Sequence, residues 1–226
     1  MKTSPIGFGR KVVMDAKKKI GIFGGTFDPP HRAHLVMAEN AYKALQLDEV
    51  WFMPNNIPAY KVSDHEIASA KNRTEMLTML VKDKEWGKVS TIELERDGNT
   101  YTSDTLTILT EDYPEYEFYL VIGSDSLMSM HWWHEVATIF KLANIVVLCR
   151  GTDTKEELTE EVKKLRNQYD GNVILIENEV MDISSSEIRV ILSDKENDRS
   201  VIEEKLMEKL PSDIVSYIYD NELYGT

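Results

Sequence analysis

Short apolar runs alternate along the chain with segments whose apolar residues recur at helical spacing. The runs predict strands over residues 19–23, 49–53, 88–94, 117–122, 144–149 and 172–176. The periodic segments predict helices over residues 31–46, 68–81, 103–111, 126–141 and 155–168, with shorter helices over 185–192, 201–209 and 212–221. Strands that are separated by helices indicate βαβ units and a parallel sheet.

The runs over residues 118–122 and 145–148 are apolar throughout, which is typical of a sheet covered on both faces. We therefore expect an α/β fold, a Rossmann-like doubly wound parallel sheet with helices on both faces and a small C-terminal helical segment. No repeat or Pro-rich linker divides the chain. We expect a peripheral extension over residues 1–18 and a single domain over 19–226.

The segment over residues 20–34 predicts a strand, a glycine turn and the start of a helix. Gly24 and Gly25 let the backbone approach an anion closely, and a helix N-terminus offers unpaired N–H groups to a phosphate. We expect Asp28 to be the N-cap, with Pro29 at the first helical position. His31 and His34 then share one face of the first turn, where imidazoles donate hydrogen bonds to phosphoryl oxygens.

Neither a Walker-type lysine motif nor a G-x-G-x-x-G fingerprint follows this turn. Two other interpretations of the histidine pair stay open. The pair could have a structural role, or it could join His131 and His134, a second H-x-x-H pair, in a zinc site.

A second polar segment covers residues 183–189 and carries three serines and Arg189. Ser184 and Glu187 have the spacing of a capping box that opens a helix. The same helix N-terminus, with serine hydroxyls and an arginine beside it, is suited to binding an anion.

Composition narrows the class of protein. The 226 residues are 42% hydrophobic, which suffices for one sizeable core. The net charge of −13 argues against a partner that is nucleic acid or a membrane surface. One cysteine, Cys149, allows no intramolecular disulfide and favours a reducing compartment, the cytoplasm. No apolar run reaches the length of a transmembrane helix. The sequence leaves open a homo-oligomer.

The glycine turn with His31 and His34 resembles the T/H-x-G-H motif of the nucleotidyltransferase superfamily, with Ala33 in place of the motif's glycine. The segment over 183–189 resembles the I-S-S-x-x-I-R motif of the same superfamily. Residues 51–61, 98–105, 123–133 and 210–224 are similar to the bacterial nicotinate-nucleotide adenylyltransferases. The resemblance implies an enzyme of NAD biosynthesis that joins ATP and nicotinic acid mononucleotide into deamido-NAD, releasing pyrophosphate.

The resemblance also implies a role for each matching residue. Those implied to contact ATP are Gly24, Gly25, Thr26, Phe27, His31, His34, Gly123, Asp125, Ser184, Ser185 and Arg189, of which His31, His34 and Arg189 are implied to be catalytic. Those implied to contact the nicotinate nucleotide are Asn55, Lys61, Thr102 and Trp133. Mg²⁺ is implied as the cofactor, bound through the phosphates of ATP rather than by a metal site on the protein.

Some of these residues keep a second interpretation. Trp132 could be the ring that stacks on the pyridine in place of Trp133, and either ring could be a core anchor. Asp125 could be only the N-cap of the helix that follows it, and Lys61 an ordinary loop lysine.

The alternative functions are of three kinds. One is adenylyl transfer to nicotinamide mononucleotide or phosphopantetheine, another is nucleotide binding without catalysis, and the third is a metal-binding regulator that uses both histidine pairs.

Overall fold

A computed structural model of the chain describes residues 16–56, 67–96, 98, 100–149, 155–177 and 181–226. Its strands are β1 (Lys18–Gly25), β2 (Glu49–Pro54), β3 (Gly87–Val89), β4 (Tyr116–Gly123), β5 (Ala143–Cys149) and β6 (Val173–Glu177). Its α-helices are α1 (Arg32–Leu45), α2 (Ala70–Val81), α3 (Thr102–Asp112), α4 (Ser124–Ser129), α5 (Val136–Leu142), α6 (Lys155–Tyr169), α7 (Ser185–Leu192), α8 (Arg199–Leu206) and α9 (Ser212–Asp220). Two 3₁₀ turns are η1 (Met130–Trp132) and η2 (Leu223–Gly225).

Within the described residues, the strands form a six-stranded parallel sheet in the order β3-β2-β1-β4-β5-β6. The chain therefore moves outward from β1 to one edge, returns to β4 beside β1, and then moves to the other edge. Ligands of such sheets bind outside the carboxyl ends of the strands, at the point where this direction reverses. The predicted parallel α/β fold is confirmed, and the reversal lies between β1 and β4.

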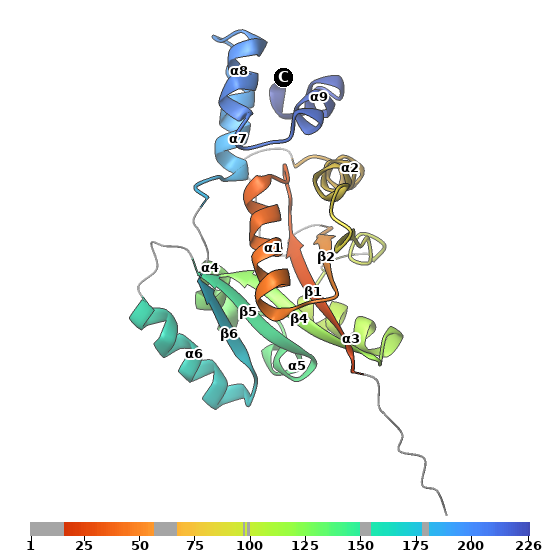
Figure 1. Ribbon diagram of the computed structural model, residues 1–226, viewed down its shortest axis with the longest axis vertical. Helices are drawn as coiled ribbons and strands as arrows, with labels where there is room; N and C mark the ends of the chain where they lie inside the picture. The colour runs from red at the N-terminus through yellow and green to blue at the C-terminus, as the bar shows by residue number, and fades with distance from the viewer. Residues whose placement is uncertain (1–15, 57–66, 97, 99, 150–154, 178–180) are drawn as a thin grey trace, which may run out of the picture.

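Side chains of β1, β2, β4, β5 and β6 alternate between two apolar layers, so the sheet is covered on both faces. Val121 packs in the layer formed with α1, α2 and the C-terminal helices, whereas Ile122 packs in the layer formed with α3, α4, α5 and α6. Figure 1 shows α7, α8 and α9 gathered beyond the end of the sheet at which β1 finishes. The C-terminal segment therefore lies beyond the carboxyl ends of the strands, where a ligand is expected.

Two predicted elements are wrong in extent. The strand predicted over residues 88–94 ends at Val89, because the backbone N–H groups of Leu94 and Glu95 bond to the carbonyl of Thr91 and close a turn. The helix predicted over residues 126–141 is broken into α4, η1 and α5. Glu135 adopts a left-handed conformation, with φ 49°, just before α5. Apolar residues keep a helical spacing across this break, so periodicity alone did not reveal it.

Glu49 joins three strands at the start of β2. Its carboxylate accepts hydrogen bonds from Lys18 Nζ at 2.7 Å, Lys88 Nζ at 2.6 Å and Trp51 Nε1 at 2.8 Å. Burial by itself raises the pKa of Glu49, but these hydrogen bonds and the lysine charges outweigh it and lower the pKa to about 2. The carboxylate therefore stabilises the fold in its ionised form.

Candidate functional site

The turn after β1 lies at the point where the sheet changes direction. A Cβ at Gly24 would meet no atom within 4 Å, so this position faces open space. A Cβ at Gly25 would lie 3.0 Å from the ring of Phe27, and Phe27 itself has φ 52°. The carbonyl of Thr26, which lies between Gly25 and Phe27 in the chain, accepts a hydrogen bond from the buried Arg73. The turn therefore leaves the backbone at Gly24 open to approach at the end of β1.

The predicted N-cap is wrong: His31, not Asp28, is the N-cap of α1, which begins at Arg32. Asp28 is 3% exposed, and its Oδ1 accepts hydrogen bonds from the Ala68 backbone at 3.1 Å and the Tyr224 hydroxyl at 2.7 Å. These tertiary contacts hold the carboxylate away from the first turn of α1. The sequence showed a good capping residue but not its distant partners.

His31 and His34 lie together at the start of α1, as the spacing predicted. Their ring centroids are 3.7 Å apart and the rings stack with an interplanar angle of 28°. His34 Nδ1 accepts a hydrogen bond from the backbone N–H of His31 at 3.2 Å. A neutral imidazole that accepts at Nδ1 carries its proton on Nε2, so His34 presents Nε2–H as a donor. Phe27 packs edge-on to the His34 ring at 5.0 Å and fixes its plane.

The start of α7 contacts the same turn. Ser184 is the N-cap, with its Oγ accepting from the Glu187 backbone at 3.1 Å, which confirms the N-cap of the predicted capping box. Ser185 Oγ donates to the Pro29 carbonyl at 2.9 Å, and Arg189 Nη1 donates to the Asp28 carbonyl at 2.6 Å. The two segments that carry the sequence motifs, far apart in the chain, therefore meet at the end of β1.

Arg73 of α2 connects two strand-end loops. It is 2% exposed, and it donates to the carbonyls of Thr26 at 2.7 Å, Asn55 at 2.9 Å and Ala68 at 3.0 Å. Burial lowers the pKa of this guanidinium, while the charge of Asp28 opposes that effect. Arg73 thus ties the glycine turn after β1 to the loop after β2.

The sequence interpretation missed Arg73, although a signal was present. Arg73 lies at helical spacing from Met76, Leu77 and Leu80, all buried on the core face of α2. A cation on the apolar stripe of a helix is seldom buried unless it is paired. The position of Arg73 on this stripe therefore indicated a buried arginine with polar partners.

Asn55 lies directly after β2 and is held to the glycine turn. Its backbone N–H donates to the Gly25 carbonyl at 3.0 Å. Its side-chain Oδ1 is buried and has no hydrogen-bond partner among the described residues. An unpaired buried acceptor is costly, so this amide is suited to a donor on a bound molecule. Lys61, predicted to act with Asn55, lies outside the described residues.

Thr102 and Trp133 come from segments that the fold brings together. Thr102 is the first residue of α3, after the N-cap Tyr101. Trp133 follows η1 with an extended backbone, and the next residue, His134, packs its ring on Tyr101 with centroids 4.3 Å apart. Trp132 is 82% exposed, whereas Trp133 packs against the core layer on this face.

A polar network fixes the start of α3. Arg96 donates to Thr105 Oγ1 at 3.0 Å and to Asp104 Oδ2 at 3.1 Å, and Thr105 donates to Glu93 at 2.9 Å. Burial raises the pKa of Glu93. Asn56 Nδ2 donates to the Arg96 carbonyl at 3.1 Å, so the loop after β2 is joined to the segment that precedes Thr102.

Gly123 and Asp125 stand at the carboxyl end of β4, next to β1. Gly123 is the N-cap of α4, and Asp125 lies exposed in its first turn, so the N-cap interpretation of Asp125 is wrong. A Cβ at position 123 would lie 2.5 Å from Asp125 Oδ1, since the carboxylate folds back over the glycine.

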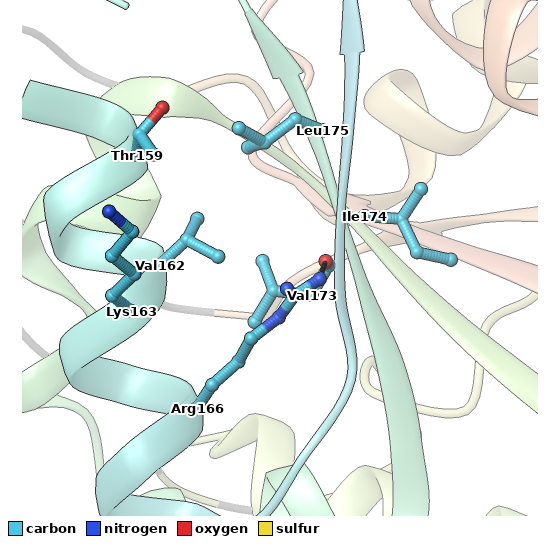
Figure 2. Close-up of a pocket in the computed structure, with 7 residues that line it drawn as sticks. All are labelled: Thr159, Val162, Lys163, Arg166, Val173, Ile174 and Leu175. Carbon is cyan, nitrogen blue, oxygen red and sulfur yellow. Dashed lines mark hydrogen bonds between the residues drawn. The ribbon is translucent and has the colours of Figure 1, made fainter. Parts of the chain in front are cut away.

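A cavity of about 390 Å³ between α6 and the edge strand β6, shown in Figure 2, contains none of the predicted site residues; it is lined by Thr159, Val162, Lys163, Arg166, Val173, Ile174 and Leu175. In the part of the chain that is described, no three His, Cys, Asp or Glu side chains gather as a metal site, so the two histidine pairs do not form a zinc centre there.

No helix among the described residues has the length and apolar character to span a membrane.

Comparisons with known proteins agree on one family. Residues 22–191 match the family model described as cytidylyltransferase-like. A Bacillus licheniformis protein named "Probable nicotinate-nucleotide adenylyltransferase" is 34% identical, covering 92% of this chain and 100% of the relative. A Shewanella pealeana protein of the same name is 36% identical, covering 91% and 95%. The solved structure of Plasmodium falciparum nicotinic acid mononucleotide adenylyltransferase complexed with NaAD superposes with a TM-score of 0.71 at 25% identity, covering 92% of this chain and 97% of that one.

Proposed function

Because the chain belongs to the cytidylyltransferase-like family and, within it, to the nicotinate-nucleotide adenylyltransferases, we propose that it transfers the adenylyl group of ATP to nicotinic acid mononucleotide. A phosphate oxygen of the mononucleotide attacks the α-phosphorus of ATP, the bond to the β-phosphate oxygen breaks, and deamido-NAD and pyrophosphate leave. The observation that carries this proposal is the stacked pair His31 and His34 at the start of α1, directly after the open glycine turn.

The triphosphate binds over the glycine turn. The positive end of the α1 dipole faces the phosphates, although the Arg32 N–H already donates to the Lys209 carbonyl at 3.0 Å and the His31 N–H to His34 Nδ1 at 3.2 Å. His34 donates from Nε2, because its Nδ1 is already an acceptor, and His31 stacks behind it to hold the ring in place. Both imidazoles stabilise charge that develops as pyrophosphate leaves.

The motif of α7 provides the second set of phosphate contacts. Arg189 brings a positive charge to the turn after β1, and Ser184 and Ser185 stand at the N-terminus of α7. A local cation is needed here, since the whole chain carries a net charge of −13 and repels an anion at long range. We assign Arg189 to the leaving pyrophosphate.

The mononucleotide lies between the loops after β2 and β4. Thr102 at the N-terminus of α3 binds the nicotinate carboxylate, where the helix dipole favours an anion. Trp133, rather than the exposed Trp132, stacks on the pyridine, because Trp133 follows η1 with an extended backbone and packs against the apolar layer. Asn55 and Lys61 contact the rest of the nucleotide, and Gly123 and Asp125 contact the ribose of the adenylate.

The chemistry requires no general base, since the attacking phosphate oxygen is anionic at neutral pH. The rate enhancement then comes from alignment of the two phosphates and from electrostatic stabilisation. Mg²⁺, bound together with ATP, would supply neutralisation of the phosphate charge. Such an ion would be held through the oxygens of ATP and would retain several waters.

A panel of acceptors tests the proposal. Purified protein is mixed with ATP and Mg²⁺, and pyrophosphate release is measured with nicotinic acid mononucleotide, nicotinamide mononucleotide or phosphopantetheine. We expect release with the acid and at least tenfold lower kcat/KM with the amide, because a site built for a carboxylate leaves its donors unpaired. Equal rates with the amide, or release only with phosphopantetheine, would show that the substrate is not nicotinic acid mononucleotide. No pyrophosphate release with any acceptor would show that the protein binds nucleotides without catalysis.

A further inference from the structure

We propose that Tyr224, in η2 at the end of the chain, is a positioning residue that holds Asp28 so that Arg189 keeps its charge available for the phosphates of ATP. The inference rests on the proposed function, because it assigns Arg189 to ATP. The sequence motifs assign no role to Tyr224, and the only role they gave Asp28, that of N-cap, is wrong.

Asp28 collects donors from distant parts of the chain. Its Oδ1 accepts from the Tyr224 hydroxyl at 2.7 Å and from the Ala68 backbone at 3.1 Å. Its backbone carbonyl accepts from Arg189 Nη1 at 2.6 Å, while the same nitrogen lies 4.0 Å from Asp28 Oδ2. The carboxylate is 3% exposed, so these contacts lie in a water-poor environment, where they are strong.

The phenol is suited to act as a fixed donor. Tyr224 has φ 59°, a conformation uncommon for an aromatic residue, and its hydroxyl reaches Asp28 Oδ1 at 2.7 Å. Burial, followed by the nearby charge of Asp28, raises the pKa of Tyr224 far above its ordinary value. The hydroxyl therefore stays protonated over the whole working range of pH and always donates to the carboxylate.

The geometry around Arg189 shows what this donor does. Arg189 is bound to the main-chain oxygen of Asp28 and to Ser186 Oγ at 3.1 Å, but its distance from the carboxylate is longer than a hydrogen bond. Without the phenolic donor the carboxylate can rotate toward the guanidinium and form a closer ion pair. That pair would neutralise the charge that attracts the triphosphate.

The test replaces Tyr224 with phenylalanine, which removes only the hydroxyl. The control is Tyr217→Phe, since the Tyr217 hydroxyl donates to Asn72 Oδ1 at 3.1 Å and joins α9 to α2 without touching Asp28. We expect Tyr224→Phe to lower kcat/KM for ATP about tenfold, the effect of one hydrogen bond to a charged group. The KM for the mononucleotide should stay within about twofold, as should every constant of the control.

A double-mutant cycle with Asp28→Asn separates positioning from general stability. If Tyr224 acts through Asp28, then Tyr224→Phe has no further effect on kcat/KM for ATP once Asp28 is an amide. Additive effects, or a tenfold loss in the Tyr217→Phe control, would overturn the inference, as would wild-type kinetics for Tyr224→Phe.

Binding of ATP with Mg²⁺, measured by isothermal titration without the mononucleotide, keeps this inference separate from the proposed function. Failure of the enzyme to release pyrophosphate with any acceptor would reject the proposed function alone. The titration would still decide whether Tyr224→Phe weakens ATP binding, as expected, or leaves it unchanged, which would reject the positioning role.

Discussion

His34→Ala tests the proposal at the turn after β1. The imidazole of His34 makes two kinds of contact in the structure. Its Nδ1 accepts from the His31 backbone at 3.2 Å, and its ring stacks on His31 at 3.7 Å. Its Nε2–H is proposed to donate to a phosphoryl oxygen. Alanine removes all of these at once, so the expected loss has a stability part and a catalytic part.

The stability part follows from the helix N-terminus. Loss of the bond to the N-cap N–H costs about 1 kcal/mol, and loss of ring stacking costs about 0.5–1.5 kcal/mol. We therefore expect the free energy of unfolding to fall by about 2 kcal/mol, measured by urea denaturation.

The catalytic part is the larger. Removal of one donor to a charge that forms in the transition state lowers kcat by about 10²–10³-fold. The assay is pyrophosphate release at saturating ATP, Mg²⁺ and nicotinic acid mononucleotide. His131→Ala is the matched control, since His131 is exposed and its ring contacts Trp132 rather than the turn.

His34→Gln separates the two parts. A glutamine three residues after the N-cap accepts from the N-cap N–H, as in a capping box. We expect this variant to recover most of the stability but little of the turnover. If His34→Ala kept near-normal turnover, or if His34→Gln restored stability and turnover together, the histidine would have a structural role only.

Three further predictions concern other parts of the fold. Arg73→Lys keeps the charge but loses the planar guanidinium that donates to several carbonyls. Urea denaturation should show a loss of about 3 kcal/mol in the free energy of unfolding. A loss under about 1 kcal/mol would contradict the role of Arg73 in joining the two loops. The lowered pKa of Glu49, about 2 against 4.5, means that its contribution is complete above pH 4.5 and is lost as the pH falls toward 2. After discounting for solvent screening this amounts to about 2 kcal/mol, so Glu49→Gln should flatten acid unfolding curves over that range, and unchanged curves would show that the carboxylate is not involved. Trp133→Ala should raise the KM for nicotinic acid mononucleotide about tenfold while Trp132→Ala changes it less than about twofold, and steady-state kinetics with the reverse result would assign the stacking ring to Trp132.

The sequence predicted the sheet well because the buried strands of a parallel sheet are apolar throughout. Residues 117–122 and 144–149 were located in this way, and the structure places β4 and β5 there as central strands. The glycine turn and the segment over 183–189 were also recognisable, because each combines a helix start with residues that bind anions. That the two meet at Pro29 and Asp28 follows only from the fold.

Local patterns failed where distant contacts decided the conformation. Asp28 has the right chemistry for an N-cap, yet its carboxylate is bound by Tyr224 from the end of the chain. The break before α5 is invisible to periodicity, since Met130 and Val136 are buried on both sides of it. That break leaves Trp133 with an extended backbone rather than on a continuous helix, and the ring of the next residue, His134, packs on Tyr101.

By itself, then, the amino-acid sequence determined the alternation of strands and helices, the fold class and the segments that carry the chemistry, because these depend on neighbouring residues. The tertiary structure decided which side chains serve the site from a distance. Arg73 is bound to carbonyls of two strand-end loops, and Tyr224 is bound to a carboxylate 196 positions away. Such contacts follow from strand order and helix packing, which bring remote segments to one edge of the sheet, and no local pattern records them.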